Sequence, residues 1–167
     1  LTATKDGAIF TKEEYDNYLL DIEFKFGDHA NSGVIVHTSN YKNWIPNSVE
    51  IQIADDHAMD EAPSKTSCAS IFGHKAPTKS TVKEPGEWNR MTVGCKGPMI
   101  YVVLNGEPVV EFDMGRYVSS EVNPDGTEIF DWLSTPKADL PTEGKIGFQG
   151  KHGDADIYFR NLKIKEL

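Results

Sequence analysis

The chain has 167 residues, enough for one domain with a hydrophobic core, and its 17 basic and 26 acidic residues give a net charge of −9 at pH 7. This acidic balance disfavours nucleic acid and anionic membrane surfaces as partners. No apolar run approaches the roughly 20 residues that span a bilayer, and the first residues do not form a signal peptide.

The first half of the chain contains four predicted strands. A short apolar run follows the Asp6-Gly7 turn at residues 8–11, and the clearest half-buried strand spans residues 20–26, where apolar and charged side chains alternate. Residues 32–38 are rich in β-branched side chains. In residues 49–53, valine and isoleucine alternate with Glu50 and Gln52. One face of that strand should pack, and the other should present a carboxylate and an amide.

The second half predicts further strands and one hairpin. Asn105-Gly106 is a strong signal for a two-residue hairpin turn, and Pro108 indicates that the returning strand begins at a sheet edge. The predicted strands are residues 68–72 (short), 87–96, 99–104 and 108–112.

The last strand changes its alternation at Arg160-Asn161. Ile157 and Phe159 precede the slip, and Leu162 and Ile164 follow it. A β-bulge there would keep both apolar pairs on the core side and redirect the polar pair, as bulges beside active sites do. The alternative is a kinked edge strand with solvated arginine and asparagine.

Residues 113–143 form a long loop with no sustained period, rich in Gly, Pro and acidic residues. A loop of that length is uncommon unless it is functional or disordered. The stretch Phe130-Asp-Trp-Leu133 is apolar enough to dock, which favours a loop that folds over a sheet. No stretch predicts a helix convincingly, so we expect residues 1–167 to form a single all-β domain, a two-sheet antiparallel jelly-roll sandwich.

The two cysteines carry little information. Cys68 and Cys95 lack the spacing of a metal site and read as two small buried hydrophobes. A disulfide between them, in an exported protein, remains the alternative.

Several polar residues sit where one sheet face could gather them. His37 ends an apolar strand, and His152 lies in a turn flanked by glycines. Each histidine alone is more often a surface or satisfied residue. The interpretation as a site is stronger because other polar residues also sit on strand faces or strand ends, where a concave sheet would gather them; these residues are Asn31, Glu50, Gln52 and Arg160.

Two further groups remain open from the residues alone. Asp55-Asp56-His57 suggests a metal cluster, although a solvated acidic loop explains it better because adjacent side chains point apart. Trp44 and Trp132, with Tyr41, lie in loops and could stack on a sugar ring or cap the core. The chain lacks a Gly-x-Ser-x-Gly elbow, a phosphate-binding glycine loop and a His-Glu-x-x-His motif.

Six short motifs in order resemble the 3-keto-disaccharide hydrolase family, and together they cover nearly the whole chain. They are Asn31-Ser-Gly-Val-Ile-Val-His37, Val49-Glu-Ile-Gln-Ile-Ala-Asp55, Pro85-Gly-Glu-Trp-Asn89, Leu104-Asn-Gly106, Gly147-Phe-Gln-Gly-Lys-His-Gly153 and Phe159-Arg-Asn-Leu-Lys-Ile164. The resemblance implies the concanavalin A-like jelly-roll fold. It also implies an exported (periplasmic or extracellular) bacterial enzyme that acts on carbohydrates, namely glycosides oxidised at the 3-position.

The implied reaction removes the proton at C2, eliminates the substituent at C1 and then adds water. Such a site needs a base, an acid for the leaving group, and either hydrogen-bond donors or a divalent metal ion at the enolate oxygen. By resemblance, Glu50, His152 and His37 are the proton-transfer candidates. The substrate-binding candidates are Asn31, Gln52, Asp55 and Arg160, joined by the loop aromatics Tyr41, Trp44 and Trp132.

The chain departs from the family pattern at two of these positions. The family often has arginine where this chain has His37, and one extra residue before His152 shifts that side chain. Because fold does not fix function, a non-catalytic carbohydrate-binding module on the same fold is the main alternative, and a structural or interaction domain is a third possibility.

Overall fold

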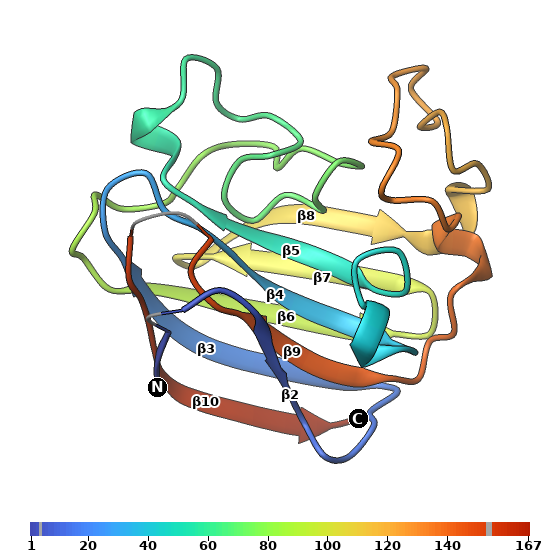
Figure 1. The fold of residues 1–167 in the computed structure, drawn as a ribbon, viewed down its shortest axis with the longest axis horizontal. Coiled ribbons are helices and arrows are strands. Elements are labelled where there is room, and N and C mark those ends of the chain that lie inside the picture. Colours follow the sequence, from blue (N-terminus) through green and yellow to red (C-terminus); the bar gives the residue numbers. More distant parts are fainter. Residues whose placement is uncertain (4, 153–154) are drawn as a thin grey trace.

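The protein is an all-β sandwich of two antiparallel sheets, described here by a computed structural model for residues 1–3, 5–152 and 155–167. Figure 1 shows the arrangement of the labelled strands. The six-stranded sheet has the order β1 (Thr2–Ala3), β10 (Ile157–Glu166), β3 (Tyr18–Phe26), β6 (Asn89–Lys96), β7 (Met99–Leu104) and β8 (Glu107–Asp113). The four-stranded sheet has the order β2 (Ala8–Phe10), β9 (Lys145–Gln149), β4 (Asn31–Thr38) and β5 (Val49–Ala54).

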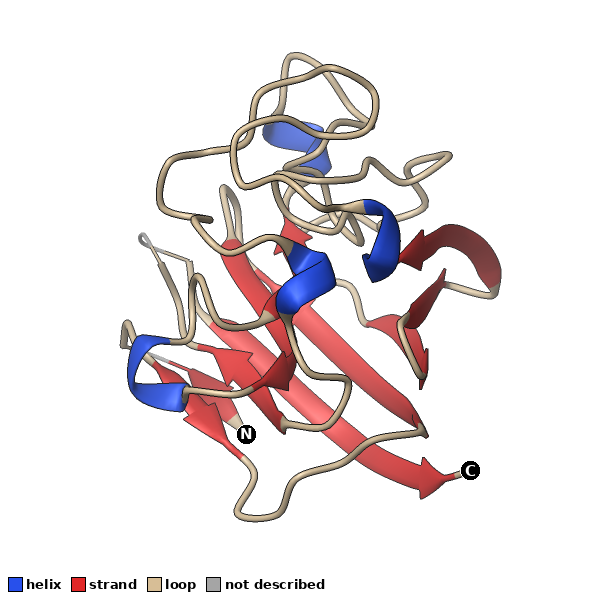
Figure 2. Ribbon diagram, turned by 90° about the vertical axis from the view of Figure 1, so that its right-hand side faces the viewer, coloured by secondary structure: helices blue, strands red, loops and turns tan. Residues whose placement is uncertain are grey.

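Helical structure in the described residues is confined to four short 3₁₀ turns. They are η1 (Tyr41–Asn43), η2 (Asp56–Ala58), η3 (Met114–Arg116) and η4 (Lys137–Asp139). Figure 2 shows most of the loops gathered at one end of the sandwich, beyond the strands. In Figure 1 the two longest loops, coloured green and orange, lie on the side of β5 and β8.

The core lies between the sheets and follows the alternation of the sequence. In β3, every second residue from Tyr18 to Phe26 is buried, and in β5 the buried apolar side chains leave Glu50 and Gln52 on the opposite face. Each large apolar side chain removed from water contributes roughly 1.5–3 kcal/mol. Cys68 and Cys95 are buried and free, as expected of small core residues.

The hairpin prediction is confirmed, and the short strand at residues 68–72 is only partly so. Asn105 and Gly106 have φ of 52° and 86°, the left-handed conformation that this turn requires, and β8 with Pro108 is the outer strand. Residues 69–72 run along the free edge of β5 and exchange backbone hydrogen bonds with Glu50 and Gln52. They form isolated bridges rather than a regular strand.

The bulge prediction in β10 is confirmed, but its expected consequence is wrong. Pairing with β3 shifts between Arg160 and Lys163. Ile157 and Phe159 are buried, whereas Leu162 and Ile164 are 41% and 39% exposed. Pairing determines which face a side chain takes, but burial also needs an opposing layer, and the core does not extend over this half of β10.

Residues 113–143 fold back against the sandwich. Ile129, Leu133 and Leu140 are buried, and Lys137 is only 2% exposed. The Asn123 side chain donates to the Gly73 carbonyl at 3.0 Å, which joins this loop to the loop after β5. These anchors hold the long loop beside β5, where it contributes to the cavity described next.

Candidate active site

A cavity of about 520 Å³ opens on the outer face of the four-stranded sheet, the face turned away from the core. Six of the residues predicted from the sequence line it: Asn31, Trp44, Glu50, Gln52, Trp132 and His152. The remaining lining residues are Asp6, Gly7, Ile45, Phe72, Leu133 and Gln149. The cavity therefore combines polar groups on strands with aromatic groups on loops, a common composition of ligand sites.

Strand register brings the polar groups together. In the β4–β5 pair, Gly33 lies opposite Gln52 and Ile35 opposite Glu50, so Glu50 and Gln52 share the outer face. The Gln52 side-chain amide donates to Asn31 Oδ1 at 2.9 Å. This bond orients both amides and leaves Asn31 Nδ2 and Gln52 Oε1 as the remaining polar atoms of the pair.

Glu50 lies at the floor of the cavity, directly over Gly33. A Cβ atom at position 33 would come within 2.2 Å of Glu50 Oε1, so the carboxyl group occupies the space that glycine leaves. Burial raises the pKa of Glu50 to about 8, against the opposing effect of the Lys137 charge. A carboxyl group that gains and loses its proton near neutral pH is suited to proton transfer.

Lys137 is a site residue that the sequence analysis missed. It lies in η4 of the long loop, and its ammonium group donates to the Ser48 carbonyl at 3.0 Å, just before β5. Burial lowers the pKa of Lys137 to about 8, while the charge of Glu50 raises it. No sequence signal identified it, because a lysine in a polar loop is ordinarily solvated.

His152 lies at the rim of the cavity together with Asp6. Its backbone N–H donates to the Asn31 carbonyl at 3.0 Å, and its Nδ1 lies 3.5 Å from Asp6 Oδ2. The side chain is 61% exposed, so it can reach a ligand that enters from solvent. The neighbouring Gly153, part of the predicted glycine-flanked turn, lies outside the described residues.

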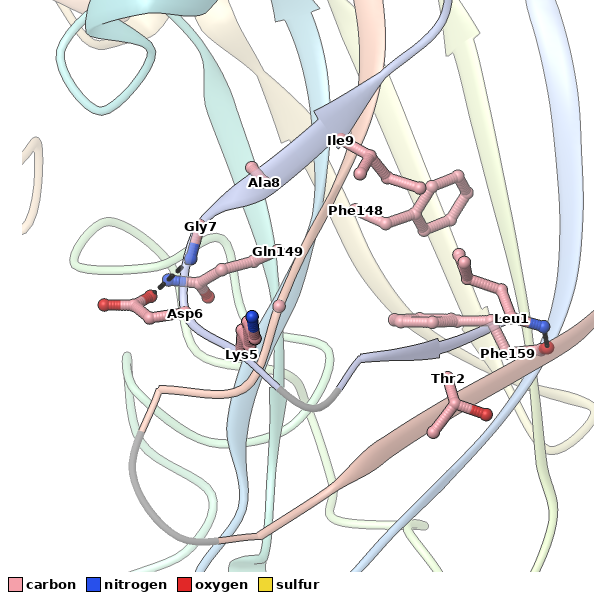
Figure 3. Close-up of a pocket in the computed structure, with 11 residues that line it drawn as sticks. Leu1, Thr2, Lys5, Asp6, Gly7, Ala8, Ile9, Phe148, Gln149 and Phe159 are labelled. Atoms are coloured by element: carbon pink, nitrogen blue, oxygen red, sulfur yellow. Dashed lines mark hydrogen bonds between the residues drawn. The ribbon is translucent and has the colours of Figure 1, made fainter.

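Gln149 is a second residue that the analysis did not select, although its motif was recognised. Figure 3 shows its side chain reaching toward the turn at Asp6 and Gly7, beside a second cavity of about 320 Å³ whose apolar wall includes Phe148 and Phe159. Gln149 Oε1 is buried and has no hydrogen-bond partner within the described residues. Alternation along β9 could have identified it, because Gln149 follows Gly147 on the outer face.

Aromatic rings form one wall of the cavity. Trp132 stacks on Phe130 with ring centroids 4.7 Å apart and planes 3° from parallel, and Phe130 stacks in turn on Phe72 at 5.6 Å. Trp132 is 56% exposed despite this packing. Trp44, which follows η1, lines the same cavity. A flat, exposed indole of this kind is suited to stacking on a sugar ring.

The structure does not bring His37 to the cavity. His37 is fully buried with a φ of 53°, and its Nδ1 lies 2.6 Å from the Thr142 carbonyl of the long loop. Because a carbonyl only accepts, Nδ1 carries the proton, and burial lowers the pKa of the ring. His37 is therefore a neutral, buried histidine that fastens the end of the long loop to β4.

Asp55, Arg160 and Tyr41 also lie outside the cavity. Asp55 caps η2 by accepting from His57 N–H, and its other carboxylate oxygen accepts from His29 N–H before β4, so both oxygens have structural roles. Arg160, on β10 of the other sheet, pairs with Glu23 at 2.6 Å and stacks on Trp88 at 3.8 Å. Tyr41 packs near Phe10 at 6.1 Å. The spacing of these residues in the sequence did not reveal which layer each would join.

The described residues do not assemble a metal site of the usual kind. Within residues 1–3, 5–152 and 155–167, no group of three or more His, Cys, Asp or Glu side chains is arranged so that it could hold a metal ion. Asp56, part of the suggested Asp55-Asp56-His57 cluster, accepts from Cys68 N–H at 2.7 Å and from the Ser80 hydroxyl at 2.6 Å. Its carboxylate is therefore already used within the protein.

Comparison with known proteins gives one family and several structures. The sequence profile of the 3-keto-alpha-glucoside-1,2-lyase-like domain matches residues 1–165. A candidate glycosyl hydrolase from Parabacteroides distasonis ATCC 8503 is 50% identical, with a TM-score of 0.95 over 99% of this chain and 86% of that chain. A second candidate glycosyl hydrolase from the same organism is 28% identical, with a TM-score of 0.76 over 97% and 75% of the two chains.

More distant structures share the fold alone. The carbohydrate-binding module CBM66 from Bacillus subtilis is 12% identical, with a TM-score of 0.57 over 99% of this chain and 86% of that chain. No curated protein matches the sequence. In the described part of the chain, no helix has the length and apolar character needed to cross a bilayer.

Proposed function

Because the chain belongs to the family of the 3-keto-alpha-glucoside-1,2-lyase-like domain, we propose that it cleaves glycosides oxidised at the 3-position. Its role is carbohydrate-related, and we assign it the activity of an enzyme that acts outside the cytoplasm, as the family resemblance implies. The observation that carries the catalytic part is the Glu50 carboxyl group, desolvated at the floor of a cavity that a sugar could fill.

The reaction follows from the acidity of the substrate. A ketone at C3 acidifies the proton on C2, and the Glu50 carboxylate takes that proton. The C2–H electron pair first moves onto the C3 oxygen as an enolate, and it then forms the C1=C2 double bond as the bond from C1 to the glycosidic oxygen breaks. His152 at the rim donates a proton to the departing oxygen. Water then adds across C1=C2, which makes hydrolysis the net result.

The other polar groups serve the oxygen atoms of the sugar. Their mutual hydrogen bond orients Asn31 and Gln52, so that Asn31 Nδ2 donates to the C3 oxygen as negative charge develops on it, while Gln52 Oε1 accepts from a sugar hydroxyl. Trp132 and Trp44 hold the apolar face of the ring. An enolate pathway of this type needs only one strong base, unlike an oxocarbenium pathway that needs two facing carboxyl groups.

The test is incubation with a 3-keto-glucoside in deuterated water, followed by NMR. We expect release of the aglycone with deuterium incorporated at C2, and we expect Glu50→Gln to lower the rate by about 10²-fold or more. Glu23→Gln, the matched change on the other sheet, should leave it unaltered. Parallel reactions with a chelator test for a metal requirement. Release of the aglycone without deuterium at C2 would refute the elimination pathway.

A non-catalytic carbohydrate-binding role is the second candidate, favoured by the two tryptophans on the cavity wall. In that case a saccharide would shift NMR signals of the cavity residues without turnover. Trp132→Ala would then reduce its affinity, while Glu50→Gln would change it little.

A further inference from the structure

Lys137 is a buried cation anchored at the start of β5, the strand that carries Glu50. The residue is 2% exposed, and its ammonium group donates a hydrogen bond to the Ser48 carbonyl at 3.0 Å. An ammonium group taken out of water is costly unless an opposite charge lies nearby. In the described part of the chain, the anionic group that acts on Lys137 is the Glu50 carboxylate, two residues along the strand from Ser48.

The other titratable group that faces Lys137 is His74, in the loop after β5. His74 is 3% exposed, and its Nδ1 lies 3.1 Å from Asn123 Oδ1. Burial, followed by the charge of Lys137, lowers the pKa of His74 to about 4. His74 is therefore neutral at physiological pH and leaves Glu50 as the anionic partner of Lys137.

We propose that Lys137 is a positioning residue for Glu50: its buried ammonium group fastens the long loop to the start of β5 and stabilises the ionised Glu50 carboxylate. This role rests on the proposed function, in which ionised Glu50 removes the C2 proton. The long loop therefore has two roles: Trp132 forms part of the cavity wall, and Lys137 keeps the Glu50 carboxyl group ionised. The position of the loop and the ionisation of Glu50 are thus coupled through the Lys137 side chain.

The first experiment measures the ionisation of Glu50 without any substrate. Protein labelled with ¹³C at the glutamate carboxyl carbon is titrated by NMR, and the Glu50 signal is assigned as the one absent from Glu50→Gln. In Lys137→Met, which retains the length of the side chain and removes its charge, the Glu50 signal should titrate about one pH unit or more higher. Lys75→Met is the matched control, because Lys75 also donates to a backbone carbonyl, that of Glu111 at 2.7 Å, and does not act on Glu50. An unchanged Glu50 titration in Lys137→Met would overturn the proposal.

A reciprocal measurement guards against a variant that fails to fold. Two coupled groups shift one another by the same free energy, so Glu50→Gln should lower the pKa of Lys137, followed at its ¹³Cε signal. Lys137→Arg, which keeps the charge, should restore the Glu50 titration toward that of the wild type. A Lys137 signal that titrates identically in wild type and Glu50→Gln would equally refute the coupling.

Kinetics then separate this proposal from the proposed function. In Lys137→Met the pH–rate profile should move to higher pH, so that kcat at pH 7 falls about tenfold while KM changes little. A shifted Glu50 titration in a protein that never cleaves a 3-keto-glycoside would refute the proposed function and leave the coupling standing. If Lys137→Met shows an unchanged Glu50 titration and the protein cleaves the 3-keto-glycoside normally, the coupling is refuted and the proposed function stands.

Discussion

Replacing Gly33 by alanine should displace the Glu50 carboxyl group and little else. The new Cβ would lie 2.2 Å from Glu50 Oε1 and 2.8 Å from its Cγ, whereas real Cβ contacts essentially never fall below 3.0 Å. The carboxyl group must therefore move by about 1 Å, a misplacement that can lower a catalysed rate about 10²-fold. We expect kcat/KM of Gly33→Ala for the 3-keto-glucoside to fall by that factor.

The stability of Gly33→Ala should change little although its activity falls. The φ of Gly33 lies outside the left-handed region, and the group that must move is a side-chain end rather than backbone. Alanine in a strand is itself favoured over glycine by roughly 0.5–1 kcal/mol, so the free energy of unfolding should stay within about 1 kcal/mol of the wild type. Denaturant unfolding and circular dichroism check this expectation.

The matched control is Gly94→Ala, in β6 of the other sheet. Its added Cβ meets the flexible Leu19 side chain at 3.1 Å, far from any residue of the cavity floor. That variant should keep wild-type turnover. A folded Gly33→Ala protein with undiminished kcat/KM would refute the placement of Glu50 as the base.

Three further outcomes follow from the site. Trp132→Ala removes an indole that is 56% exposed, so it should raise KM about tenfold and change the free energy of unfolding by less than about 1 kcal/mol, as measured by kinetics and urea unfolding. Arg160→Ala should leave turnover unchanged, because Arg160 pairs with Glu23 and stacks on Trp88 on the other sheet. Burial raises the pKa of Glu50 from 4.5 to about 8, so the stability from its protonated form is full below pH 4.5 and lost as the pH rises through about 8. Glu50→Gln should therefore raise Tm relative to the wild type at pH 8, by about 3 °C or more, and not at pH 4.

Each of these outcomes has a clear contrary result. An unchanged KM in Trp132→Ala would remove the indole from the substrate site. A loss of turnover in Arg160→Ala would mean that Arg160, at the bulge of β10, contributes to the reaction. A Tm difference between Glu50→Gln and wild type that does not vary with pH would mean that Glu50 titrates normally.

The local patterns of the sequence were sufficient for most of the strands and for half of the residues that line the cavity. Period-two alternation identified β3 and β5, and the same alternation places Glu50 and Gln52 together on a face, because successive side chains of a strand point to opposite sides. Asn105-Gly106 specified the hairpin because few residues accept a positive φ at both turn positions. These features depend only on neighbouring residues.

Tertiary structure decided which layer and which depth each remaining residue occupies. Arg160 and His37 both lie in motifs that resemble the family. However, Arg160 is on the six-stranded sheet, and His37 is buried beneath the end of the long loop. Lys137 is 87 residues from Glu50 in the chain, and only the folding of residues 113–143 against β5 buries its charge beside that carboxyl group. Alternation reports the face of a strand, but desolvation and long-range charge pairing exist only once distant segments have packed, and they determine the ionisation of this site.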